Sequence, residues 1–62
     1  MSFTVKQARM YAGKTQREMA KHLKINVQTY RKIEVSSKSA TIEQAKKISE
    51  VTGIPYDEII FA

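Results

Sequence analysis

Apolar residues recur about every three to four positions in successive stretches of this 62-residue chain, and polar breaks separate the stretches. Such spacing places the apolar side chains on one side of a helix, where they can share a core. The pattern predicts a compact all-α domain of five helices, and it contains no strand signal, internal repeat or low-complexity segment. The expected helices cover residues 2–12, 15–23, 27–35, 41–53 and, as a short last helix, 55–62.

The helix boundaries are marked by residues suited to capping. A threonine followed three residues later by glutamine or glutamate can satisfy two free backbone N–H groups at a helix start, because each side chain bonds to the other residue's backbone. Asn26 suits the start of the third helix, while Gly13 and Gly53 suit the ends of the first and fourth. The threonine pairing occurs at Thr4 and Gln7, Thr15 and Glu18, and Thr41 and Gln44.

Residues 15–34, TQREMAKHLKINVQTYRKIE, have the layout of two short helices that meet at a tight corner. Helical spacing in the second helix turns Tyr30 and Ile33 toward the core, with the Tyr30 hydroxyl reaching the surface. This is the layout of a helix-turn-helix, in which one helix crosses a DNA backbone and the next presents side chains to the major groove. The side chains expected to point outward are those of Val27, Gln28, Arg31 and Lys32.

The formal net charge of +5 is unevenly distributed along the chain. Residues 1–39 contain nine lysines and arginines against two glutamates, whereas residues 40–62 contain two lysines against four acidic residues. A basic segment joined to an acidic one favours a polyanion as the partner of one face. The alternative, that the lysines only keep a small domain soluble, explains a total charge better than a segregated one.

The composition gives no indication of catalysis, a metal site or a cofactor. The chain has no cysteine, which excludes disulfides and thiolate zinc sites, and His22 is the single histidine, without a second histidine as partner. Neither a signal segment nor an apolar run of the about 18 residues that span a membrane is present. We expect one soluble, cytoplasmic domain, residues 1–62, with no evident small-molecule ligand.

The order of these features resembles one known family. Arg9 with Gly13, then TQREMAKHL, INVQTYRKIE and TIEQAKKISEVTGIPYDEII, follow the order and spacing of the Cro and repressor (XRE-like) helix-turn-helix domains of phage and bacterial regulators. The resemblance runs from Val5 to Ile60. It implies a five-helix domain of the lambda-repressor-like type that binds double-stranded operator DNA in the nucleoid, usually as a homodimer, as a Cro-like protein or compact repressor. The alternative is a protein-interaction module of the same fold, antitoxin-like or an adaptor.

The resemblance also implies roles for single side chains. Gln16 has the position of a residue that bonds a phosphate and braces the recognition helix, while Arg9 and Glu34 have those of a partly buried ion pair. Lys24 stands at a corner position that is usually glycine, where a left-handed conformation costs about 1 kcal/mol. Together with the charge of Arg17, the resemblance gives the expected phosphate contacts, which are Gln16, Arg17, Asn26, Thr29, Ser36, Ser37 and Lys38.

The same resemblance places base-reading positions at Val27, Gln28 and Lys32, with Arg31 either reading a base or touching the backbone. The Gln28 amide matches the N6 and N7 edge of adenine, Lys32 can donate to guanine O6 or N7, and the Val27 methyls can pack on a thymine methyl. A solvated helix face is the alternative for Gln28 or Lys32 taken alone.

The apolar end of the chain has two interpretations. Ile59 is expected in the core, but so small a domain cannot bury Ile60 and Phe61 as well, so one of them is expected to form a two-fold contact. Two recognition helices would then face successive major grooves about 34 Å apart, and the operator would be an approximate inverted repeat. The alternative is that Phe61 folds onto its own core.

Overall fold

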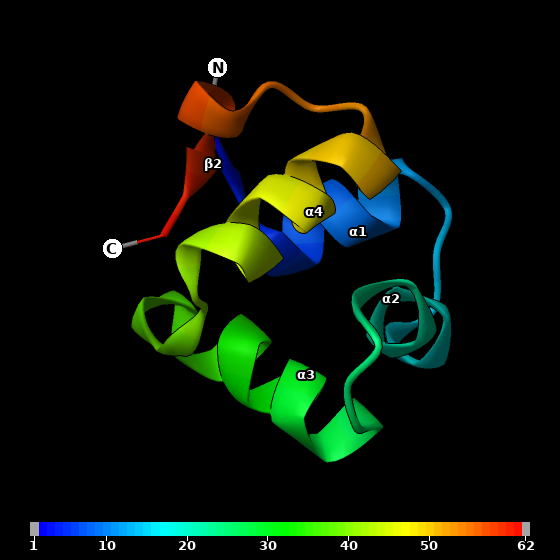
Figure 1. The fold of residues 1–62 in the computed structure, drawn as a ribbon. Coiled ribbons are helices and arrows are strands. Elements are labelled where there is room, and N and C mark those ends of the chain that lie inside the picture. The colour runs from blue at the N-terminus through cyan, green and yellow to red at the C-terminus, as the bar shows by residue number, and fades with distance from the viewer. Residues whose placement is uncertain (1, 62) are drawn as a thin grey trace.

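Four α-helices surround one core in the computed structural model, which describes residues 2–61 (Figure 1). Met1 and Ala62, the ends of the expected domain, lie outside the described residues. No helix in the described part of the chain is long and apolar enough to cross a membrane. The elements in chain order are β1 (Phe3–Thr4), α1 (Val5–Tyr11), α2 (Gln16–Leu23), α3 (Val27–Val35), the 3₁₀ helix η1 (Ser37–Ser39), α4 (Ile42–Thr52), the 3₁₀ helix η2 (Tyr56–Glu58) and β2 (Ile59–Ile60).

The expected capping residues begin the four helices. At α3, the Asn26 Oδ1 atom accepts a hydrogen bond of 2.7 Å from the backbone N–H of Gln28. The last turn of α4 ends at Gly53, whose φ of +75° is left-handed. Each helix starts one residue after its cap, so α1 begins at Val5 and not at Ser2. Reciprocal capping bonds of 2.8–3.1 Å form at Thr4, Thr15 and Thr41.

The corner between α2 and α3 depends on one lysine. Lys24 ends α2 with φ 58° and ψ 41°, and within residues 2–61 it is the only residue other than glycine with a positive φ. This turn lets the Ile25 N–H donate to the Ala20 carbonyl at 3.0 Å. The chain thereby leaves α2 sharply, and α3 starts after Asn26. The expected left-handed lysine is confirmed.

The core joins the apolar faces of all four helices, but two expectations about it are wrong. Helical spacing groups Ile42 with Ala45 and Ile48 and so predicts it in the core, but Ile42 is 70% exposed. At the first position of α4, it precedes the buried stripe formed by Ala45, Ile48 and Thr52. The Tyr30 hydroxyl does not reach the surface, since it lies buried beside Glu34. The largest fully buried side chains are Tyr30, Met19, Ile33, Ile48 and Val5.

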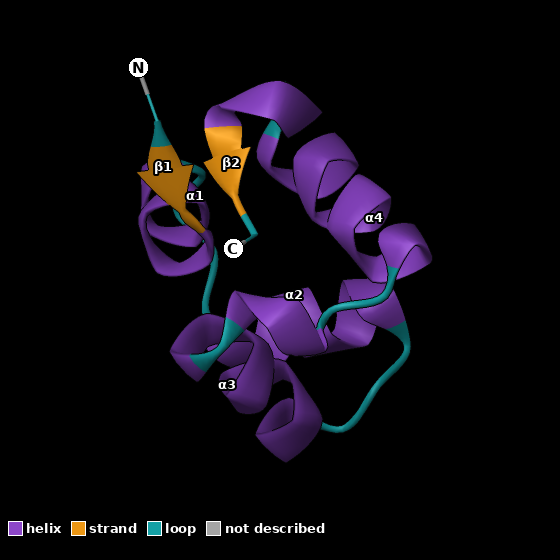
Figure 2. Cartoon of the chain, turned by 90° about the vertical axis from the view of Figure 1, so that its left-hand side faces the viewer, coloured by secondary structure: helices purple, strands orange, loops and turns teal. Residues whose placement is uncertain are grey.

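The expected fifth helix is also wrong. After Pro55, which is itself extended, the chain makes only the short turn η2 and then becomes strand β2. Strand β2 pairs in parallel with β1, so that the two strands lie side by side (Figure 2). The extended backbone points Ile59 into the core and Ile60 outward, because successive side chains of a strand lie on opposite faces. Pairing with Phe3 and Thr4 therefore decides the conformation here.

Candidate nucleic-acid interface

The outer face of α3 carries most of the side chains expected to meet DNA bases. Gln28, Arg31 and Lys32 are exposed, on the side of the helix away from its buried residues. Val27 is different, because as the first residue of α3 it is half-buried and packs against the core. Its expected outward orientation is therefore only partly correct.

Val35 is a further exposed residue of α3 for which the sequence motif indicated no role. It is 89% exposed, which is the highest value among the exposed large hydrophobic side chains of residues 2–61. Val35 lies seven residues after Gln28, which places both on the same face of the helix. Helical spacing from Gln28 could have identified it as an outward-facing apolar residue.

A partly buried ion pair ties α3 to α1. The Arg9 Nε atom lies 2.6 Å from Glu34 Oε2, and their side chains are 14% and 5% exposed. The Arg9 Nη1 atom also donates to the Lys14 carbonyl at 2.9 Å, which fixes the segment between α1 and α2. Burial alone would raise the pKa of Glu34, but hydrogen bonds from Arg9 and Gln16 and the charge of Arg9 hold it below its ordinary value.

Tyr30 lies under this ion pair. Its hydroxyl is buried and makes no hydrogen bond of standard geometry within residues 2–61. The charged groups of Glu34 and Arg9 are nevertheless close enough to influence its pKa. Burial, followed by the neighbouring Glu34 carboxylate, raises the pKa of Tyr30 far above its ordinary value. The phenol is therefore neutral and fills the core below the charged groups.

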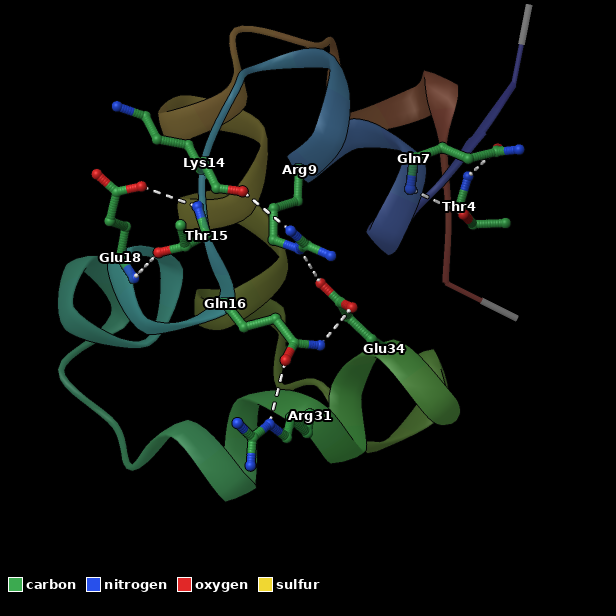
Figure 3. A network of polar contacts seen from close by, with 9 residues as sticks. All are labelled: Thr4, Gln7, Arg9, Lys14, Thr15, Gln16, Glu18, Arg31 and Glu34. Carbon is green, nitrogen blue, oxygen red and sulfur yellow. Dashed lines mark hydrogen bonds and ion pairs between the residues drawn. The ribbon is translucent and has the colours of Figure 1, made fainter.

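Gln16, the first residue of α2, extends the ion pair into a longer network (Figure 3). Its Nε2 atom donates to Glu34 Oε1 at 2.9 Å, and its Oε1 atom accepts a hydrogen bond of 3.1 Å from Arg31 Nε. Figure 3 shows Gln16 between Glu34 and Arg31, reaching from α2 to α3. The network thus links three helices and ends at an exposed guanidinium group on α3.

The other side chains expected to bind phosphates lie on α2 and near both ends of α3. The side-chain oxygen of Asn26 is used by the cap of α3, which leaves its NH₂ group for another acceptor. The Ser39 N–H and hydroxyl groups both donate to the Ser36 carbonyl, at 2.9 and 2.7 Å, and so stabilise η1 directly after α3. Arg17, Thr29, Ser36 and Lys38 are exposed, and Ser37 is half-buried.

A hollow of about 320 Å³ lies where the end of α3 meets η1 and β2, and its lining includes Val35, Lys38 and Ile60. Ile60 is 44% exposed. Phe61 is half-buried against the core and stacks on Tyr56, with ring centroids 5.5 Å apart. Of the two residues expected to form a dimer contact, Ile60 is thus the more exposed, and Val35 lines the same hollow.

Acidic and histidine side chains gather nowhere in this surface. Within residues 2–61, no three histidine, aspartate or glutamate side chains are grouped so that they could hold a metal ion. His22 is exposed and lines a separate shallow hollow between α2 and the start of α4.

The comparison with known families agrees with this geometry. The model of a family described as helix-turn-helix (HTH_3) matches residues 5–59, which contain α1 to α4 and every residue of the polar network. The chain belongs to this helix-turn-helix family. Helix-turn-helix proteins of this Cro and XRE type are DNA-binding regulators. No significant match was found among curated proteins or among solved structures.

Proposed function

We propose that this helix-turn-helix protein is a sequence-specific transcription regulator, a Cro-like protein or compact repressor of phage or prophage type, that acts by occupying operator DNA. The observation that supports this most strongly is the braced outer face of α3. Its inner face is fixed by Tyr30 and Ile33, and its last turn is held by Glu34. A reading helix fixed before binding loses little conformational entropy when it enters the major groove.

The side chains on this face can distinguish bases. Gln28 can donate and accept at the N6 and N7 edge of adenine, and Lys32 can donate to guanine. Val27 would contribute only the part of its side chain that remains exposed, as a contact to a thymine methyl. Each good contact of this kind discriminates by about 1 to 3 kcal/mol.

Charged and polar groups around α3 would supply contacts to the phosphates. The exposed Arg17 and Lys38, the NH₂ group of Asn26, and the hydroxyl-bearing residues after α3 are available for this. Such contacts give affinity that depends on salt but carries no sequence information. The basic character of residues 1–39 fits a DNA backbone as partner.

We also propose that the regulator binds as a homodimer. Ile60 and Val35 are exposed apolar side chains that line one hollow at the end of α3. A two-fold contact there would bring the C-terminal ends of two recognition helices near each other and their reading faces onto one side of the duplex. The operator would then be an approximate inverted repeat with half-sites about 34 Å apart.

The experiment that tests the function is selection of bound duplexes from a random DNA pool at near-physiological salt. The proposal expects an enriched inverted repeat, bound about 10³-fold or more tightly than random DNA. If no sequence is enriched, the proposal is wrong, and a protein-interaction module of the same fold becomes the better explanation.

Variants of α3 test which side chains read the operator. Gln28→Ala should weaken binding by about 1 to 3 kcal/mol and relax the preference at one base position in each half-site. Lys32→Ala should relax a different position. The control is Lys46→Ala, which removes one positive charge from the exposed surface of α4. Equal losses for Gln28→Ala on the operator and on random DNA would contradict a base-reading role.

A further inference from the structure

The polar network that starts at Arg9 ends at Arg31, where two of the three guanidinium nitrogens make no hydrogen bond within residues 2–61. Arg31 is exposed, and within residues 2–61 its one hydrogen bond is the one from Nε to Gln16 Oε1, 3.1 Å long. The two terminal nitrogens of its guanidinium group therefore keep their hydrogen atoms for a ligand. Because the Nε bond fixes one edge of a planar group, it also sets the direction in which that pair of nitrogens points.

The orientation of the Arg31 guanidinium group follows from the contacts of the network, beginning at its buried end with Glu34. The Glu34 carboxylate can only accept hydrogen bonds, so it binds the nitrogen of the Gln16 amide, at 2.9 Å. The amide oxygen must then point the other way, toward Arg31, as Figure 3 shows. The carboxylate itself is oriented by Arg9 through its other oxygen. An otherwise flexible surface arginine is thus held by a chain of contacts rooted in the core.

The position of Arg31 on α3 separates it from the residues proposed to read bases. Opposite the buried side of the helix, Gln28 occupies the middle of the exposed face. Helical spacing puts Arg31 on the flank shared with Glu34, which faces α1 and α2, and puts Lys32 on the other flank. Arg31 is therefore drawn toward the first residue of α2, the helix that in this motif crosses the DNA backbone.

We propose that Arg31 binds a backbone phosphate and not a base, and that Gln16 is the residue that positions it. This inference rests on the proposed DNA-binding function and refines it, because it removes Arg31 from the set of specificity-determining residues. The terminal pair of guanidinium nitrogens matches the oxygens of a phosphate, and such a contact is independent of sequence.

The first test compares Arg31→Ala with Lys32→Ala, which removes an equal charge from the same helix. Affinity is measured for the selected operator, for single-base variants of it and for random duplexes, over a series of salt concentrations. For Arg31→Ala we expect the affinity for every duplex to fall by about tenfold, with the base preferences unchanged. The slope of the logarithm of the affinity against the logarithm of the salt concentration should become less steep by about one unit per half-site. Lys32→Ala should instead change the preference at one position.

The two ways of failing are distinguishable. If the wild-type chain prefers no sequence, the proposed function fails and this inference fails with it. If the wild-type chain selects an operator and Arg31→Ala relaxes one base position while random DNA is bound as before, only the inference is overturned.

The second test addresses the positioning role through a double-mutant cycle. Gln16→Met keeps the side-chain length but removes both the donor and the acceptor. We expect it to weaken operator binding severalfold in the wild-type background and much less in the Arg31→Ala background, because its effect passes through Arg31. Thermal unfolding of each variant checks that the fold is intact. Additive losses in the cycle would overturn the positioning role.

Discussion

Glu34 is the one carboxylate in the described chain that receives hydrogen bonds from two other helices, from Arg9 of α1 and Gln16 of α2. These bonds require its ionised form, and they hold the pKa of Glu34 below the ordinary value of 4.5 although burial opposes this. The folded chain therefore binds this proton less well than the unfolded chain does. The resulting stability is present above pH 4.5 and is lost as the pH falls through the lower pKa of the folded state.

We expect the free energy of unfolding to fall as the pH drops below 4.5, with Glu34 a main contributor. Urea unfolding between about pH 7 and pH 3 measures the fall, and carbon NMR of the side-chain carboxyl groups follows Glu34 itself. Glu18→Gln is the control. Hydrogen bonds with Thr15 also lower the pKa of the exposed Glu18, and this variant separates the contribution of Glu18 from that of Glu34. A Glu34 carboxyl group that titrates at or above 4.5 would contradict the expectation.

Contacts of single side chains were predictable only where a local pattern or the family resemblance pointed to them. The positions of Arg9 and Glu34 came from the resemblance. The bond between Gln16 and Arg31 did not, because it depends on how α2 and α3 cross, which no spacing within either helix specifies. The Tyr30 hydroxyl was likewise expected at the surface, whereas it is buried beside Glu34 of its own helix and Arg9 of α1.

The secondary-structure elements show the same distinction between local and distant causes. The starts of α1 to α4 follow from side chains within three residues of each cap. The four capping residues were predicted correctly, although the first helix was expected to begin at Ser2, ahead of its cap at Thr4. The segment after Pro55 was predicted as a helix from its local residues. It becomes a strand because Ile59 pairs with Phe3, a partner at the other end of the chain that local periodicity cannot reveal.

The turn between α2 and α3 offers a test at the scale of the element. Lys24→Gly should raise the free energy of unfolding by about 0.5 to 1 kcal/mol, because glycine adopts the left-handed conformation of this position without steric cost. The matched control is Lys21→Gly inside α2, which should lower it by about 1 kcal/mol. Denaturant unfolding measures both, and equal losses would show that the turn carries no strain.

Over the whole molecule, the exposed apolar side chains predict how two copies meet. Ile60→Lys should convert the proposed dimer into a monomer and weaken operator binding by about tenfold or more, because a buried unpaired charge opposes the two-fold contact. Sedimentation equilibrium and titration of the operator measure these effects. Ile42→Lys introduces the same charge at another exposed isoleucine, on α4, and should leave both unchanged. A dimer that survives Ile60→Lys would place the contact elsewhere.

The pairing of β1 with β2 has a consequence for the order in which the molecule forms. Phe3 and Ile59 are almost a full chain length apart, so their pairing closes the largest loop in the fold and is expected after the helices have packed. Hydrogen exchange should then show that the backbone amides of β1 and β2 exchange faster than those of α2 and α3. Because Ile60 belongs to β2, a subunit would gain its partner surface only when this last closure is complete. In that case, only fully folded chains would dimerise and bind the operator as dimers.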